Sequence, residues 1–170
     1  MNNRLRETFG AILTSAVILI SFLGPVPVYA QSPMTSGAIV AFANQDRASA
    51  SVGALSEDAL LDKAAQAKAD DMAAKGYFSH IDPSGNAPWV WFKKVGYYYY
   101  GAGENLAIDF SDAQSLNTAW MNSPAHRANI VRGTYSRVGI GIARGTYQGK
   151  SATFIVEFFA KPYTTRVALR

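Results

Sequence analysis

The sequence predicts an α+β domain, because helical patterns fill its first half and strand patterns its end. Apolar residues recur at helical spacing in residues 37–49 and 57–75, whereas apolar residues alternate with glycine or alanine in 138–143. Turn residues at 145–150 separate that run from a second strand over 153–160, which is hairpin spacing. Helices followed by closely spaced strands indicate a small antiparallel sheet with helices packed on it.

The first 30 residues have the three parts of a secretory signal peptide. Arg4 and Arg6 make a basic start, and residues 11–23 are apolar and uncharged. Val28 and Ala30 place small side chains at the -3 and -1 positions of a cut after Ala30. The apolar run is shorter than the roughly 18 residues that a membrane span needs. We therefore predict cleavage, no stable membrane span afterwards, and a secreted protein that is extracellular, periplasmic or held at the cell envelope.

Length and composition predict one domain after cleavage. We place it at residues 37–163, after a flexible leader at 31–36 and before a C-terminal tail at 164–170. The chain has no cysteine, which excludes thiolate chemistry and a lipid-modified cysteine. Its net charge of +4 is scattered along the sequence, without the basic stripe that a nucleic-acid backbone requires. The sequence therefore predicts no nucleic-acid partner, and it carries no signal for an oligomeric state.

Local signals set the middle elements of the chain. Ser56 is the predicted N-cap of the second helix, and Gly76 is its predicted C-terminal stop. Residues 77–88 are rich in Asp, Pro, Ser, Gly and Asn, which is typical of a loop. A short helix over 89–95 follows.

A Gly-rich extended segment comes next, over residues 97–108. Ser111 is the predicted N-cap of a helix over 112–122, and Pro124 suits the first turn of a further short helix. In the final hairpin, the glycines within 138–143 leave one strand face nearly flat, so a helix or another backbone can lie close there.

Aromatic residues cluster around the start of the extended segment. Trp89 and Trp91 are predicted core residues. The run Tyr97–Tyr100 has two interpretations: alternate rings pack one face of a strand and expose the other, or the rings form a stacking platform for sugars or an apolar groove. The sequence favours the first.

The chain has two histidines, His80 and His126, and no motif for a serine-hydrolase elbow, a P-loop, a zincin or a dinucleotide site. Two histidines can supply two ligands of a metal site, with one carboxylate as the third. Glu104 is the candidate acid because it stands in the Gly-rich extended segment, and Asp82 and Glu157 are further acids.

The segment around His126 places polar groups at helical spacing. His126 and Asn129 are three residues apart and share a helix face, and Ser123 precedes His126 by three. One side of a short helix would thus present a hydroxyl, an imidazole and an amide. In the alternative, Ser123 only caps the helix and Asn129 only satisfies a backbone group.

Several short segments in this order resemble the CAP superfamily, also called SCP-like domains, which groups cysteine-rich secretory proteins, antigen 5 and the plant pathogenesis-related 1 proteins; the bacterial form fits best. They span residues 37–161 and are NQDR (44–47), FSH (78–80), GENL (103–106), WMNSPAHRANI (120–130), VGIG (138–141) and a closing aromatic strand. Each segment is weak alone, and their shared order makes the resemblance specific.

The resemblance implies an α-β-α sandwich, with a three-stranded antiparallel sheet between helical layers and a solvent-open cleft. The family's cleft holds two histidines and two acids that can take a divalent metal. By matching motifs, the histidines are His80 and His126 and the first acid is Glu104, but Ser123 stands where the second acid belongs. A metal such as zinc would then have two imidazoles and one carboxylate, so we expect weak binding.

Three classes of function remain open at this point. The favoured one is a binding module whose cleft takes a cell-wall, lipid or peptide ligand, with Asn105, Ser123 and Asn129 as ligand-binding residues, because the resemblance brings no single agreed reaction. The second is a peptidase- or esterase-like hydrolase, in which Glu104 and the two histidines, His80 and His126, would be catalytic through a bound water or metal. The third is capture of a divalent metal itself.

Overall fold

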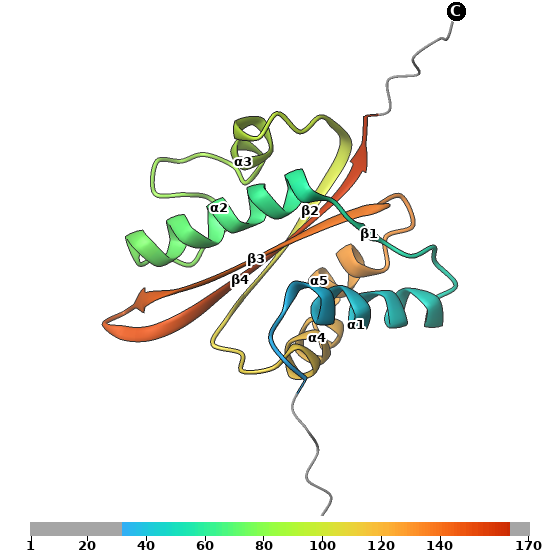
Figure 1. Cartoon of the computed structure of the whole chain (residues 1–170), viewed down its shortest axis with the longest axis horizontal. Coiled ribbons are helices and arrows are strands. Elements are labelled where there is room, and N and C mark those ends of the chain that lie inside the picture. The colour runs from blue at the N-terminus through green and yellow to red at the C-terminus, as the bar shows by residue number, and fades with distance from the viewer. Residues whose placement is uncertain (1–31, 164–170) are drawn as a thin grey trace, which may run out of the picture. The chain divides into compact units, whose positions relative to one another are not determined.

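The computed structural model describes residues 32–163 (Figure 1). The predicted signal peptide and C-terminal tail lie outside the described residues, so the predicted domain boundaries stay predictions. The elements in chain order are α1 (Ser36–Ser49), β1 (Ser56–Glu57), α2 (Ala59–Lys75), α3 (Trp89–Lys94), β2 (Tyr99–Ile108), α4 (Ala113–Asn122), α5 (Pro124–Ile130), β3 (Arg137–Tyr147) and β4 (Lys150–Pro162). Within 32–163, none of these helices has the length and apolar character to cross a membrane.

The sheet has the strand order β1-β3-β4-β2. Strands β3 and β4 form a long antiparallel hairpin, and β2 pairs antiparallel with β4, so β2 is an edge strand. The two-residue β1 adds a parallel pairing, in which Ser56 lies opposite Arg137 and Glu57 opposite Val138. The α+β class is confirmed, with four strands instead of the expected three because this short pairing joins segments far apart in sequence.

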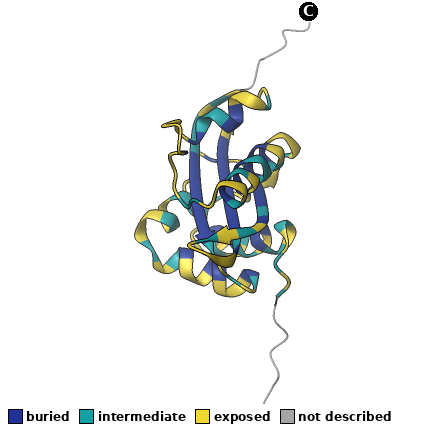
Figure 2. Ribbon diagram, turned by 90° about the vertical axis from the view of Figure 1, so that its left-hand side faces the viewer, coloured by how far each residue is buried: buried dark blue, intermediate teal, exposed yellow. Residues whose placement is uncertain are grey.

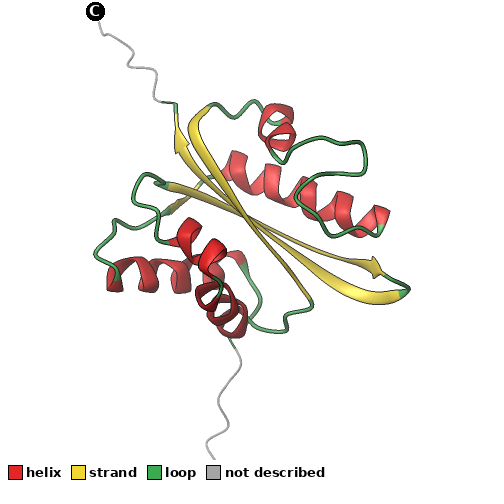
Figure 3. Ribbon diagram, turned by 180° about the vertical axis from the view of Figure 1, so that it is seen from behind, coloured by secondary structure: helices red, strands yellow, loops and turns green. Residues whose placement is uncertain are grey.

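Helices cover both faces of the sheet, as Figures 1 and 3 show. Helices α2 and α3 lie on one face, and α1, α4 and α5 lie on the other. Each face has its own apolar cluster: Leu61, Met72, Phe92 and Phe158 belong to the α2 side, and Ile39, Leu116, Ile130, Ile155 and Phe159 belong to the α1 side. The strands between the two layers are buried over most of their length (Figure 2).

The close approach of α2 to β3 depends on glycine. A Cβ at Gly139 would overlap the backbone at Leu61, and one at Gly141 would overlap the backbone at Ala65. The expectation of a flat strand face against a helix is therefore confirmed.

Two predicted helix caps are wrong. The side chain of Asp58 accepts hydrogen bonds from the backbone N–H groups of Leu60 and Leu61 at the start of α2, and Asp112 caps α4 through Ser115. Ser56 instead belongs to β1. An aspartate carboxylate adds a favourable charge at the helix start to the same capping geometry, which explains its preference over the nearby serines.

Glu157 lies in the middle of β4 and is fully buried. Its Oε2 accepts a hydrogen bond of 3.1 Å from the amide of Asn105 on the neighbouring strand. Burial raises the pKa of Glu157 to about 8, partly offset by this hydrogen bond. The carboxyl group is therefore protonated in the folded protein at neutral pH.

We expect Glu157→Gln to change the pH dependence of stability. Between the ordinary pKa of 4.5 and about 8, the folded chain keeps a proton that the unfolded chain has lost, so the free energy of unfolding falls as pH rises, by up to about 1.4 kcal/mol per pH unit. The glutamine variant lacks this loss, so its advantage over the parent should grow from pH 4.5 to pH 8. Urea unfolding across this range measures it, and parallel profiles for the two proteins would contradict the assignment.

Candidate functional site

Two adjacent residues of β2 organise the site from opposite faces of the sheet. Side chains alternate along a strand, so Glu104 points toward α2 and Asn105 toward α5. Because β2 is an edge strand, the loop that follows α2 and the helix α5 both reach it. The sequence segment GEN thus connects the two helical layers at one sheet edge.

Glu104 is held by two positive or proton-donating groups. Its Oε1 lies 2.6 Å from the Nζ atom of Lys68, and its Oε2 lies 2.5 Å from Nδ1 of His80. The side chains of Lys68 and Glu104 are 0% and 2% exposed, whereas that of His80 is 58% exposed. The solvent-exposed imidazole of His80 is thus held in place by a buried ion pair.

Lys68 also belongs to the candidate site, although the sequence did not single it out. Its ammonium also donates a 2.7 Å hydrogen bond to the backbone carbonyl of His80, so one buried cation holds both the carboxylate and the loop. Burial lowers the pKa of Lys68, and the adjacent Glu104 opposes that shift. The sequence feature that could have identified Lys68 is its position on the apolar face of α2, seven residues after Leu61 and four before Met72.

The loop after His80 is ordered by its own side chains. The carboxylate of Asp82 accepts hydrogen bonds from the backbone N–H groups of Ser84 and Asn86 and from the side chain of Asn86. The bonds from Asn86 lower the pKa of Asp82. This turn fixes the path of the chain just beyond His80.

On the α5 side, Nδ1 of His126 lies 2.9 Å from Oγ of Ser123. Ser123 occupies the N-cap position of α5, yet its hydroxyl makes no capping bond to the backbone. The two side chains therefore contact each other, whereas the sequence predicted only that they share a helix face. Burial, and to a lesser degree the charge of His80, lower the pKa of His126, so its ring is neutral at pH 7.

The side-chain amides of Asn105 and Asn129 make hydrogen bonds within the protein. Asn129 donates from Nδ2 to the backbone oxygen of Glu104 and to Oδ1 of Asn105, both at 3.0 Å. Asn105 donates from Nδ2 to the backbone oxygen of His126 at 3.3 Å and to Glu157. Both residues therefore tie α5 to β2, and their predicted ligand-binding role stays a prediction, as does that of Ser123.

Side chains cover the outward carbonyl groups of β2 at every second residue. Tyr135 donates its hydroxyl proton to the oxygen of Ala102 at 2.7 Å, Asn129 donates to that of Glu104, and Trp120 donates from Nε1 to that of Leu106 at 3.2 Å. Acceptors at an open sheet edge invite pairing with another strand. Here three of them are already occupied.

The two histidines line different hollows. His80 borders a polar hollow of about 420 Å³, which we call the His80 cleft; it is lined by His80, Pro88, Trp89, Ala102, Gly103, Glu104, Asn129, Arg132 and Tyr135. His126 and Ser123 border a smaller, apolar hollow of about 280 Å³ with Phe78, Leu106, Phe110 and Trp120 among its walls. The charge of His80 contributes to the lowered pKa of His126, but the two rings do not line the same hollow.

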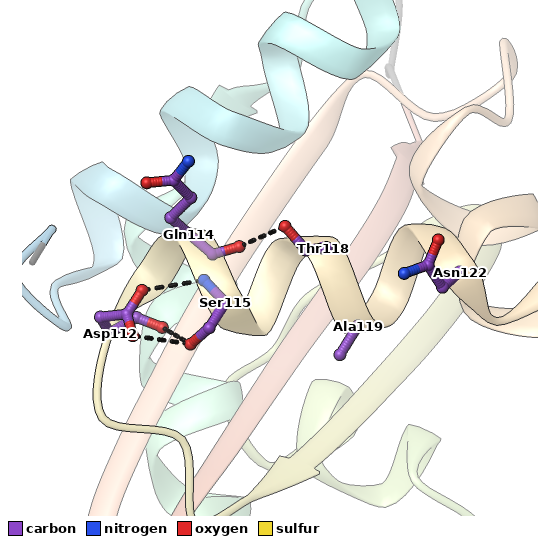
Figure 4. Close-up of a pocket in the computed structure, with 6 residues that line it drawn as sticks. All are labelled: Asp112, Gln114, Ser115, Thr118, Ala119 and Asn122. Atoms are coloured by element: carbon purple, nitrogen blue, oxygen red, sulfur yellow. Dashed lines mark hydrogen bonds between the residues drawn. The ribbon is translucent and has the colours of Figure 1, made fainter. Parts of the chain in front are cut away.

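A third hollow, of about 500 Å³, runs along the exposed side of α4 (Figure 4). Its polar groups bind one another: Asp112 accepts from the backbone and hydroxyl of Ser115, and Thr118 donates to the carbonyl of Gln114. These are helix-capping and helix-surface contacts, so this hollow is not the candidate site.

The side chains as they lie do not fit a resident divalent metal. Within residues 32–163, no three His, Asp or Glu side chains are grouped as a metal site. Both oxygens of Glu104 are engaged, and the neighbouring ammonium of Lys68 would repel a metal ion. Binding of zinc through His80, His126 and Glu104 stays a prediction that would require these contacts to rearrange.

Comparison with known proteins identifies the class. The family model of the cysteine-rich secretory protein family, CAP, matches residues 40–159, and the chain belongs to this family. The Bacillus subtilis protein YkwD is 36% identical over 103 residues, which are 61% of this chain and 40% of YkwD.

Solved structures show the same fold. An extracellular protein containing a SCP domain from Bacillus anthracis has a TM-score of 0.61 at 26% identity, over 72% of this chain and 39% of that one. An outer surface protein from Borrelia burgdorferi has a TM-score of 0.62 at 22% identity, over 74% and 90%. This chain thus spans about two fifths of YkwD and of the Bacillus anthracis protein.

We expect Lys68→Met to lower the free energy of unfolding by about 3 kcal/mol, because it leaves the buried carboxylate of Glu104 without its ammonium. The double variant Lys68→Met/Glu104→Gln should recover most of this loss, since no buried charge then remains unpaired. Urea unfolding measures both values.

The matched control is Lys75→Met, because the ion pair of Lys75 with Asp71 is half exposed and should cost at most about 0.5 kcal/mol. Equal costs for the two lysine variants, or a double variant that costs the sum of Lys68→Met and Glu104→Gln, would contradict the buried pair.

Proposed function

We propose that this protein is an exported CAP-domain protein whose His80 cleft binds a ligand of the cell envelope. The observation that carries the proposal is the exposed imidazole of His80, oriented by Glu104 and seated at the mouth of a polar cleft. A ring with one nitrogen fixed by a carboxylate presents its other nitrogen in a defined direction. Such a preorganised group binds a ligand without an ordering cost.

Export is supported by the amino-terminal sequence and by the fold relatives. Residues 1–30 have signal-peptide character, and the similar solved structures include an extracellular and an outer surface protein. Cleavage after Ala30 would release the domain to the envelope, where wall, lipid and peptide ligands are available.

Weak zinc binding through His80, His126 and Glu104 is a less favoured alternative, because the contacts of Glu104 would first have to rearrange. Its support is that two imidazoles and one carboxylate are available as ligand types. The lowered pKa keeps the His126 ring neutral at pH 7, which a metal ligand requires. The Lys68 ammonium would repel a zinc ion, so an organic ligand is the stronger proposal.

The test is to add soluble peptidoglycan fragments from a muramidase digest to the isotope-labelled protein and to follow amide resonances. We expect shifts to gather at Gly103, Glu104 and Asn129, and His80→Ala to weaken binding about two- to tenfold through the loss of one hydrogen bond. His126→Ala is the control, because that ring borders the other hollow, and it should leave the affinity unchanged. Shifts confined to the His126 hollow, or none, would overturn the proposal.

A hydrolase is the second candidate, and the contact between His80 and Glu104 favours a specific form of it. Glu104 has no free oxygen to act as a base, so His80 takes that role. Its solvent-facing nitrogen would remove a proton from water as the water oxygen attacks a carbonyl carbon. The bond from that carbon to the leaving oxygen or nitrogen would then break, and the proton would pass from His80 to this leaving group.

This candidate predicts product release from peptides, esters or peptidoglycan by the parent, loss of turnover in His80→Gln and retention of turnover in His126→Gln. Chromatography of the products measures it. Absence of turnover in the folded parent would leave the binding function alone.

A further inference from the structure

The His80 cleft adjoins a second hollow through one shared side chain, Trp89. The second hollow, which we call the tyrosine hollow, has a volume of about 440 Å³ and is lined by Trp89, Lys93, Gly96, Tyr97, Tyr98 and Tyr99. We propose that an acidic glycan, a sugar chain that carries carboxylates, lies across both hollows over Trp89. This inference rests on the proposed binding function of the cleft and names the class of its ligand.

The charge of the two hollows favours an anion. Arg132 lines the cleft and Lys93 lines the tyrosine hollow; both are exposed, and neither takes part in an ion pair within residues 32–163. The acid in the lining, Glu104, is already neutralised by Lys68. A ligand carboxylate at either end would therefore meet a cation that has no acidic partner in the described part of the chain.

Arg132 is suited to a carboxylate in particular. Its guanidinium group lies 5.5 Å from the ring of Tyr135, which is itself buried and tied to β2 by its hydroxyl. This cation–π contact with a fixed ring restricts the guanidinium group, so less freedom is lost when it forms paired hydrogen bonds to a carboxylate.

The aromatic side chains supply flat surfaces that suit sugar rings. Trp89 is half-buried and held in place by Phe92 and Tyr99, with ring centroids 5.7 and 6.2 Å away. Tyr98 is 78% exposed, while Tyr97 and Tyr99 pack inward. The predicted alternation of the tyrosine run is thus confirmed, and its exposed face borders the hollow. Such rings offer an apolar face for the C–H side of a sugar and, in tyrosine, a hydroxyl for its polar edge.

The sheet edge argues against an extended peptide as the occupant. A peptide that adds as a strand requires free backbone donors and acceptors along the edge strand. The outward oxygens of Ala102, Glu104 and Leu106 already accept hydrogen bonds from Tyr135, Asn129 and Trp120, all within the protein. A ligand in the cleft would therefore bind to side chains and aromatic faces, and not by backbone hydrogen bonds to the edge strand.

Three soluble probes of similar length test the ligand class by calorimetry on the chain without residues 1–30. They are peptide-free peptidoglycan glycan strands, whose lactyl groups are free carboxylates, a neutral N-acetylglucosamine oligomer, and an oligoglutamate peptide. We expect the acidic glycan to bind at least about tenfold more tightly than either of the others. Arg132→Ala should remove most of that preference, about tenfold, and leave the weak binding of the neutral oligomer unchanged.

Tyr98→Ser should weaken both glycans alike, because it removes a stacking face without removing charge. Arg127→Ala, at an exposed arginine of α5 outside both hollows, is the matched control and should have no effect. Circular dichroism confirms folding of each variant.

Equal binding of acidic and neutral glycans, unchanged binding by Arg132→Ala, or tighter binding of the peptide would overturn the inference. Binding of the muramidase digest without binding of the peptide-free strands would overturn the glycan class and leave the proposed function of the cleft intact. Failure of the digest itself would remove both.

Discussion

The buried ion pair between Lys68 and Glu104 determines the geometry of the sheet edge. Its two charges are almost completely removed from water, which is costly unless both find further partners. The ammonium finds one in the backbone oxygen of His80, and the carboxylate finds one in the ring of the same residue. Both charged groups thus gain a second polar partner from the loop after α2, which they hold against β2. His80 therefore reaches solvent in one orientation.

The next residue of β2 extends this arrangement through the sheet. Asn105 points to the other face, where it contacts Glu157 and the backbone of His126, and Asn129 returns from α5 to the backbone of Glu104. These hydrogen bonds hold α5 against β2 at the strand positions of Glu104 and Asn105. This explains why both helical layers contribute to one edge although their apolar clusters are separate.

The parts of the fold that depend on local sequence were predictable from it. Helical spacing located α1 and α2, the glycines of β3 predicted the close approach of α2, and the three-residue spacing of Ser123 and His126 predicted that they share a helix face. β1 could not be predicted, because two residues acquire strand character only by pairing with a distant strand. The partner of Glu104 was missed for a similar reason: a lysine on an apolar helix face becomes meaningful only once the opposite strand is known.

The family resemblance led to the expectation of a cleft with two histidines and two acids. In this chain Ser123 stands at the place of the second acid, and a lysine supplies positive charge at the first. The ammonium of Lys68 balances the charge of Glu104. The fold of the family is retained.

Nitrogen-15 resonance of the lysine side chains measures the buried ion pair directly. At pH 7 we expect a Lys68 ammonium signal whose hydrogens exchange slowly with water and whose position shifts in Glu104→Gln, in contrast to the exposed Lys75. A neutral amine at Lys68, or exchange as fast as that of Lys75, would show that no buried ion pair supports the site.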